Sequence, residues 1–282
     1  MCIRDSSTIG RILKENAEKV KGKSATRANH RLKKLIPLKI LDEQVDSPGT
    51  VQADTVAHCG SALAGDFANT LTVTDVFSGW TANRACWNKT AKEIKKNIAK
   101  IEEKLPFVIK FFDTDCGTEF LNYTVMEYFE RSKYRGKLHK PNKVRMRRSR
   151  PYKKNDQCYV EQKNFTHVRN LFAYDRLDHF YLIEMMNDIY ENCWNPLHNY
   201  FLPSSKLEKK MRVGSKIKKI HDKPKTPAQR IIDHKKTPQH IKRMLKMNQK
   251  KLDPIELKEN LEKKLSLFFT ALKKLNMSRD AA

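Results

Sequence analysis

The chain has 282 residues and a formal net charge of +25, far more positive than solubility requires. Such an excess favours nucleic acid as the partner, because cationic side chains release counterions from a polyanion. Membrane association is not expected, since the sequence has no uninterrupted apolar stretch of about 18 residues and no signal peptide. Six cysteines without a CxxC pair argue against a zinc ribbon or finger and are typical of a reducing cytoplasm.

The first 45 residues are basic and have little apolar content. Residues 7–13 predict a short helix that begins with a hydroxyl cap. We expect residues 1–45 to be either a helical remnant of a helix-turn-helix DNA-binding region or a leader, and the natural chain to begin further upstream.

The pattern changes at about residue 46, where three β-rich runs are separated by turn residues. A helix with apolar residues at spacings of three or four follows, and then a nearly continuous apolar strand that ends at an Asp-Thr-Asp-Cys-Gly turn. Further helices complete the region up to residue 202. This order predicts a mixed sheet flanked by helices. The expected strands are 50–56, 70–76, 81–87 and 107–112, and the expected helices are 90–105, 119–131, 153–173 and 178–194.

Residues 203–282 form a third region of different composition. Between residues 206 and 251 there are 17 Lys and Arg against three acids, a surplus of 14. Prolines exclude a long continuous helix there, and residues 213–220 suggest a short basic strand pair. We expect a DNA-holding appendage, with a solvated tail as the alternative. The last helix, at 253–275, either packs on the domain or serves as a dimer or docking helix.

Three acids stand where a metal site is expected. Asp54 lies in the middle of an apolar strand, where a bare carboxylate is costly to bury. Asp115 follows the buried strand, at the sheet end where ligands bind. Glu161, in an otherwise basic and amide-rich segment, would be the third acid on a helix. Hard oxygen ligands of this kind suit Mg²⁺ or Mn²⁺. The alternative is that these acids form turns or solvated faces, and Asp75 and Asp113 also lie near strand ends.

Four segments carry a resemblance to a known family: VQADTVAH, LTVTDVFSGW, FFDTDCGTEF and RSRPYKKNDQCYVEQKN. Together they resemble the catalytic core of bacterial insertion-sequence transposases, in the integrase superfamily with an Asp-Asp-Glu triad. The resemblance covers roughly residues 45–205. It implies an RNase H-like α/β fold at 46–202, with the helical remnant before it and the basic region after it. It also implies a catalytic, metal-binding triad of Asp54, Asp115 and Glu161, with two Mg²⁺ or Mn²⁺ ions.

The chain departs from the family pattern in two places. Cys116 replaces the Asn that usually follows the second Asp, which removes an amide but not a metal ligand. Residues 116–160 make the interval between the last two acids longer than in retroviral integrases, and the basic segment 131–148 would carry the excess as a loop or hairpin.

Cations and amides around Glu161 are expected to support the site. A cluster of basic residues would hold DNA phosphates, although any single one could be only a solvated charge. Three further residues are expected to contact and orient the metal ligands. For one of them, His58, a purely structural role is the alternative. The DNA-binding candidates are Arg148, Arg150, Lys153, Lys154, Lys163 and Arg169, and the supporting candidates are His58, Asn155 and Asn164.

The expected function is therefore metal-dependent cleavage of DNA at the ends of a mobile element, followed by strand transfer into target DNA. The resemblance implies double-stranded DNA as the partner, a homo-oligomer and a cytoplasmic, nucleoid-associated location. Two rivals remain: a catalytically inactive DNA-binding remnant, and an RNase H-like nuclease that cuts RNA–DNA hybrids.

Overall fold

The computed structural model describes residues 29–39, 45–131, 144–150 and 153–280. The helix expected at 7–13 lies outside the described residues, and so does most of the loop expected at 131–148. Among the helices of the described residues, none combines the length and apolar character needed to cross a membrane.

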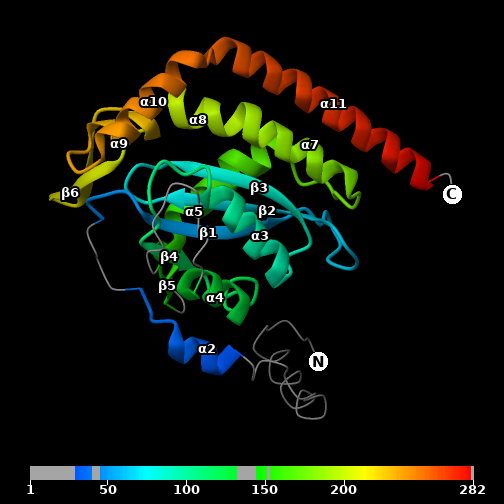
Figure 1. Ribbon diagram of the computed structural model, residues 1–282, viewed down its shortest axis with the longest axis horizontal. Helices are drawn as coiled ribbons and strands as arrows, with labels where there is room; N and C mark the ends of the chain where they lie inside the picture. Colours follow the sequence, from blue (N-terminus) through cyan, green and yellow to red (C-terminus); the bar gives the residue numbers. More distant parts are fainter. Residues whose placement is uncertain (1–28, 40–44, 132–143, 151–152, 281–282) are drawn as a thin grey trace, which may run out of the picture.

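A five-stranded mixed sheet forms the centre of the molecule, in the order β3-β2-β1-β4-β5 (Figure 1). Strand β2 is antiparallel to β1 and β3, whereas β4 is parallel to β1 and β5 is parallel to β4. The carboxyl ends of β3, β1, β4 and β5 therefore meet at one edge of the sheet. The strands are β1 (Thr50–Ala57), β2 (Ala68–Asp75), β3 (Thr81–Trp87), β4 (Phe111–Thr114) and β5 (Arg145–Arg148).

Helices cover both faces of this sheet (Figure 1). On one face lie α3 (Ala91–Glu102) and α4 (Tyr123–Arg131). On the other lie α5 (Cys158–Lys163), α7 (Tyr181–Ile189) and α8 (Asn195–Phe201), with the long helix α11 (Pro254–Asp280) packed over them. This is the α/β arrangement that the RNase H-like resemblance implies. The remaining elements are α2 (Asn29–Leu35), η3 (Lys154–Gln157), η4 (Asn164–Arg169), α6 (Asn170–Phe172), η5 (Tyr190–Trp194), β6 (Leu207–Val213), β7 (Lys216–His221), α9 (Pro227–Asp233) and α10 (Gln239–Lys251).

The apolar run at 107–112 was expected to be a strand, and this prediction is wrong for its first four residues. Lys110 N and Phe111 N both donate to Gly49 O, so the β1–β4 ladder starts only at Phe111, opposite Thr50. Residues 107–110 instead cross the end of the sheet, where Phe107 is buried in the core. The strand β5 was not predicted, because a run of basic residues hides its single buried Met.

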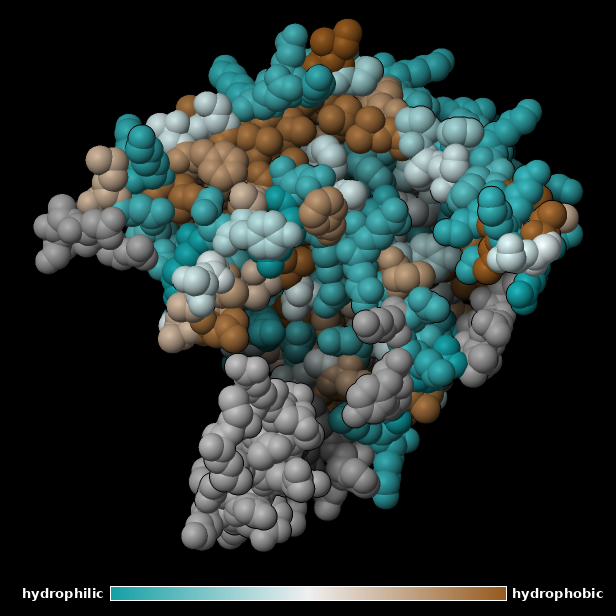
Figure 2. Space-filling model, turned by 180° about the vertical axis from the view of Figure 1, so that it is seen from behind, coloured by the Kyte–Doolittle hydropathy of each residue, from teal (hydrophilic) through white to brown (hydrophobic). Residues whose placement is uncertain are grey.

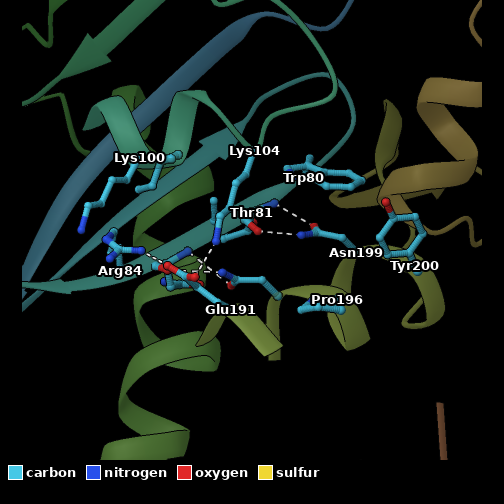
Figure 3. A pocket seen from close by; sticks show the side chains of 13 residues that line it. Trp80, Thr81, Arg84, Lys100, Lys104, Glu191, Pro196, Asn199 and Tyr200 are labelled. Atoms are coloured by element: carbon cyan, nitrogen blue, oxygen red, sulfur yellow. Dashed lines mark hydrogen bonds and ion pairs between the residues drawn. The ribbon is translucent and has the colours of Figure 1, made fainter. Parts of the chain in front are cut away.

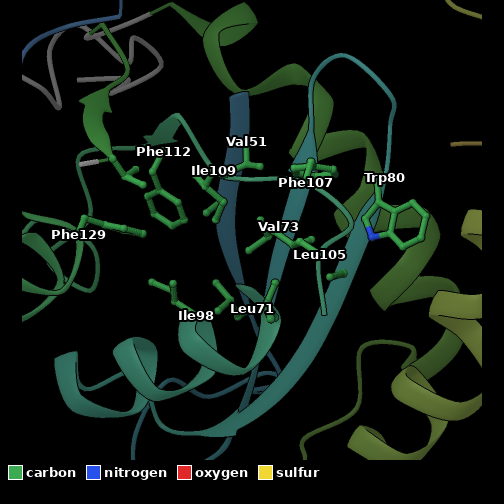
Figure 4. Packing of buried hydrophobic residues seen from close by; sticks show 14 of the residues in the cluster. Val51, Leu71, Val73, Trp80, Ile98, Leu105, Phe107, Ile109, Phe112 and Phe129 are labelled. Atoms are coloured by element: carbon green, nitrogen blue, oxygen red, sulfur yellow. The ribbon is translucent and has the colours of Figure 1, made fainter. Parts of the chain in front are cut away.

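The two faces of the sheet differ in chemistry. One face is apolar: Val51, Leu71 and Val73 pack with Ile98 and Phe112 around α3 and α4 (Figure 4). The opposite face is polar although it is buried. Alternation along the strands places on it Gln52, Asp54, Thr70, Thr72, Thr74 and Asn83. Elements that cover this face therefore bind it by hydrogen bonds as well as by packing.

The region after residue 203 packs on the domain through its helices. Ile231 of α9 and Leu245 of α10 are wholly buried in the same core as the sheet. Phe268 of α11 packs edge-on against Phe172, with 5.0 Å between the ring centroids. Figure 2 shows the side of the molecule hidden in Figure 1, where hydrophilic side chains cover most of the surface and apolar ones gather in a band near the upper edge.

The edge strand β3 is covered by three asparagines of the α7–α8 segment. Asn199 Nδ2 and Oδ1 bond with Thr81 O and Thr81 N at 2.8 and 2.9 Å (Figure 3). Asn195 and Asn187 pair in the same two-bond manner with the backbones of Asn83 and Ala85. Each amide thus replaces the backbone of a missing neighbouring strand. These bonds fix the α7–α8 segment along the strand.

Replacing Asn199 by Ala is expected to lower the free energy of unfolding by about 2–4 kcal/mol, because Thr81 N–H and C=O are left buried without partners. The matched control is Asn192→Ala, since Asn192 is an exposed asparagine of the same segment. Its effect should stay within about 0.5 kcal/mol. Urea denaturation of both variants tests this, and equal losses would refute the role of the amide bonds.

Candidate functional site

The register of the sheet brings two of the three predicted acids together. Ala53 of β1 stands opposite Thr114 of β4, so the next residues, Asp54 and Asp115, are lateral neighbours. Adjacent strands lie about 4.8 Å apart, and both side chains have the same alternation in the pleat. The pair therefore lies where β4 ends, beside the middle of β1, which is parallel to it.

Both carboxylates are held in an environment that disfavours their charge. Burial, helped by the nearby charges of Asp115 and Glu119 and opposed by hydrogen bonds from Thr55 and Asn164, raises the pKa of Asp54 to about 6. Burial also raises the pKa of Asp115, with the charge of Glu119 acting in the same direction. Asp54 Oδ1 accepts from Thr55 N at 2.7 Å, and Asp115 Oδ1 accepts from Gly117 N at 2.8 Å. The site concentrates negative charge where a cation would relieve it.

The third predicted acid, Glu161, lies on α5 with its side chain exposed. Three residues further along, Asn164 Nδ2 donates to Asp54 Oδ2 at 2.7 Å. Residues three apart share one face of a helix, so Glu161 lies one turn from the residue that touches Asp54. In the described part of the chain, no three His, Cys, Asp or Glu side chains converge to hold a metal ion. The structure thus brings the two aspartates together and leaves Glu161 beside them.

Gln52 positions α5, and the sequence reasoning did not identify it. This side chain is wholly buried on the polar face of β1, two residues before Asp54. Gln52 Oε1 accepts from Tyr159 N and Val160 N at 3.1 and 3.2 Å, and its Nε2 donates to Asp156 O at 2.8 Å. The available signal was a long polar side chain between Val51 and Ala53, inside a predicted buried strand.

Glu119 is a second residue that the sequence reasoning missed. Its carboxylate Oε1 accepts from Thr55 Oγ1 at 3.1 Å, next to Asp54 in the chain. Gly117 makes this approach possible, since a Cβ there would lie 2.5 Å from Glu119 Oε2 and 2.8 Å from Asp115 Oδ1. Glu119 is part of the segment FFDTDCGTEF, but only the folded loop shows that its carboxylate lies near the two aspartates.

The donor set suits a hard divalent cation held by two carboxylates. Mg²⁺ is commonly bound by one or two carboxylates together with waters and substrate phosphates. Asn164 Oδ1 is a further hard oxygen: it is buried and has no hydrogen-bond partner among the described residues. It is therefore available to a cation or to a water bound to one. The residues present fit such an ion, with Glu161 close by on α5.

The other supporting candidates have different positions. His58 is wholly buried, with its Nε2 2.9 Å from Thr70 Oγ1, and burial lowers its pKa to about 3. These contacts agree with the structural alternative for this histidine. Asn155 is exposed in η3. Cys116 Sγ lies 3.7 Å from Ser149 O and packs against the apolar core.

Several predicted DNA-binding cations have partners within the protein. Arg150 forms an ion pair with Asp156, and Arg148 Nε donates to backbone oxygens of α2 and its end. Lys163 Nζ lies 3.1 Å from His198 Nε2, and burial lowers its pKa. Arg169 NH2 donates to Ala57 O at 3.0 Å. Lys153 is exposed, and the side chain of Lys154 lies outside the described residues.

A pocket of about 170 Å³ lies elsewhere, at the β3 edge between α3 and α8 (Figure 3). Arg84 of β3 and Lys104 both pair with Glu191, and Asn199 is bound to Thr81 as described above. These groups already hold η5 and α8 to β3 and to the end of α3. The chemistry of the candidate site is therefore assigned to the Asp54–Asp115 pair and not to this pocket.

The Asp54→Asn variant is expected to be more stable than the wild type at pH 7.5 without metal, by about 1–3 kcal/mol, because an amide has no charge to desolvate. The pKa of Asp54 is higher in the folded protein than in the unfolded chain. The buried negative charge therefore destabilises the wild type to its full extent only above about pH 6. The advantage of the variant should shrink as the pH falls from 6 towards 4. Urea denaturation in EDTA across this range measures it.

Asp113→Asn serves as the contrasting control. Asp113 is buried and binds Arg147 through two bonds of 2.7 and 2.9 Å. Loss of that carboxylate should cost about 3–5 kcal/mol. If both variants lost stability at pH 7.5, the account of Asp54 as an electrostatically strained group would be wrong.

Comparison with known proteins adds the following. No family model matches the chain. The chain is 30% identical over 231 residues to the protein named "Uncharacterized protein y4rM" from Sinorhizobium fredii (strain NBRC 101917 / NGR234). The match covers 80% of this chain but only 62% of that relative, so the chain spans less than two thirds of its length. Among solved structures, the catalytic core domain of BIV integrase is 17% identical with a TM-score of 0.33, over 44% of this chain and 70% of that one.

Proposed function

We propose that this chain is a polynucleotidyl transferase of the Asp-Asp-Glu type, which cuts and joins DNA at the ends of a mobile element. The observation that carries the proposal is the β1–β4 register, which sets Asp54 of β1 beside Asp115, just past the carboxyl end of the parallel strand β4. The helix that carries Glu161 is fixed to the same strand by Gln52 and Asn164. This arrangement supports the proposal that Asp54, Asp115 and Glu161 act together as the triad that the sequence motifs imply.

Asp54 and Asp115 would bind the metal ions, Mg²⁺ or Mn²⁺, and Glu161 of α5 would be the third ligand. When bound, two such ions activate a water or a 3′-hydroxyl and stabilise the leaving oxygen of a phosphodiester. The chain itself supplies position: Asn164 orients Asp54, and the backbone N–H of Gly117 orients Asp115. No protein nucleophile is required.

The hairpin formed by β6 and β7 supports DNA as the substrate. Lys210 of β6 stands directly opposite Lys219 of β7, and Met211 stands opposite Lys218. Like charges directly opposite each other destabilise a strand pair. All residues of the hairpin strands except Ile220 are exposed, so the phosphates of a DNA duplex can reach these cations and offset the repulsion. Because two element ends have to be brought together, we also propose that the protein acts as a homo-oligomer.

A second candidate is a protein that binds DNA without cutting it. The observation in its favour is that Glu161 is exposed and that no three acids converge in the described part of the chain. A nuclease acting on RNA–DNA hybrids is the third candidate, and it would cut without joining.

Mg²⁺- or Mn²⁺-dependent nicking and strand transfer, assayed on DNA that carries the element ends, tests the proposal. The Glu161→Gln variant should lose roughly 100-fold or more of both activities, the scale on which removal of one charge-stabilising group acts. Glu184→Gln is the matched control, since Glu184 is an exposed glutamate of α7, and it should keep wild-type activity.

The assay should use the 282-residue chain. DNA binding without metal-dependent cutting would favour the second candidate and reject the catalytic one. Cutting of hybrids without joining of DNA would favour the third.

A further inference from the structure

A lysine next to the paired aspartates has no role in the proposed function so far. Lys89 lies in the short turn between β3 and α3, and its Nζ is 3.6 Å from Glu119 Oε1. Its positive charge also lowers the pKa of Asp115, against the larger effect of burial. The lysine thus stands at the same edge of the sheet as the two aspartates.

The direction of β3 and the turn that follows it place this lysine. Strand β3 runs parallel to β1, so the turn after it reaches the edge where β1 and β4 end. Asn88 has a φ of 56°, a left-handed conformation that asparagine tolerates better than most residues. Its side-chain Oδ1 accepts from Thr90 N at 3.1 Å and closes the turn around Lys89.

Glu119 joins three separate elements at this point. It accepts from Thr55 of β1, pairs with Lys89 of the β3–α3 turn, and lies over Gly117 of the loop after β4. The Glu119 side chain is only 11% exposed, whereas that of Lys89 is 51% exposed. A mostly buried carboxylate therefore holds the lysine, whose side chain remains half exposed and accessible to a ligand.

We propose that Lys89 binds a backbone phosphate of DNA beside the Asp54–Asp115 pair, and that Glu119 is the positioning residue that holds Lys89 there. This inference rests on the proposed function, because it takes DNA as the ligand of that pair. A phosphodiester placed over two carboxylates needs cations around it, and Lys89 supplies one from the protein itself. Such phosphate contacts fix the register of DNA without reading its sequence.

Lys89→Ala tests the phosphate contact through the salt dependence of binding to a short DNA duplex, with Ca²⁺ present. Loss of one phosphate contact should make the slope of log K against log[salt] less steep by about 0.9. Between 50 and 200 mM salt, the factor by which affinity falls should therefore be about threefold smaller for the variant than for the wild type. Lys89→Arg, which keeps the charge, should retain the wild-type slope. The matched control is Lys95→Ala, an exposed lysine of α3, and it should also keep the slope.

The Glu119→Gln variant tests whether Glu119 positions Lys89 or only repels DNA through its negative charge. If Glu119 only repelled DNA, the variant would bind DNA more tightly, whereas loss of positioning should weaken binding in the same direction as Lys89→Ala. Mn²⁺ binding, followed by the electron paramagnetic resonance of the free ion, gives an independent check. Lys89→Ala should bind Mn²⁺ at least as tightly as the wild type, because a competing positive charge has been removed.

Equal slopes for Lys89→Ala, Lys95→Ala and the wild type would overturn the phosphate contact and leave the proposed cutting and joining untouched. Tighter DNA binding by Glu119→Gln would overturn the positioning role. If the wild type bound no DNA at any salt concentration, the proposed function would fall together with this inference.

Discussion

The hydrogen bonds of Gln52 decide the geometry of the candidate site. One buried amide on β1 accepts from two N–H groups at the start of α5 and donates to the carbonyl just before it. These N–H groups have no partner inside the helix itself, so Gln52 caps α5 from the middle of the sheet. Asn164 makes the second attachment one turn beyond Glu161. The helix carrying the third acid is thus tied to the strand carrying the first.

This attachment is possible because one face of the sheet is polar. Thr70 and Asn83 on that face bind His58 and His167, and Tyr190 donates to Thr70 from η5. Polar groups removed from water are costly unless they are paired, and a paired network has few alternative arrangements. The apolar face buries hydrophobic side chains against α3 and α4, and these contacts do not require the directional geometry of hydrogen bonds. One face therefore contributes most of the hydrophobic stabilisation, and the other determines where the helices of the site lie.

Much of the fold could be predicted from the sequence, because strands and helices follow from local periodicity. The first three strands and the helices around residues 94 and 185 are found close to their predicted positions. The boundary of β4 could not be predicted, since Phe107 and Phe112 are equally apolar and only pairing with Gly49 and Thr50 separates them. The π-helical segments η4 and η5 were not predicted either, and each places a side chain on the polar face, His167 against Asn83 and Tyr190 against Thr70.

The candidate site was predictable only where a motif carries it. Asp54 and Asp115 are neighbours, whereas Glu119 folds back beside them within the loop after β4, and Lys89 contacts Glu119 from the β3–α3 turn. No spacing in the sequence reveals these two contacts. Composition does not show which cations are paired inside the protein. Arg150 is as basic as any neighbour, but Asp156 binds it. A charge run indicates a class of partner, and the fold decides which charges have partners of their own.

The asparagines along β3 have a consequence for how copies of this protein can associate. An uncovered edge strand is a template on which a strand of another molecule can add. Here the backbone groups of Thr81, Asn83 and Ala85 are already occupied by amide side chains. Copies of the chain therefore cannot extend the sheet across the β3 edge. One route to edge-to-edge aggregation is closed by side chains of the α7–α8 segment, without any charged residue on the strand edge itself being needed for it.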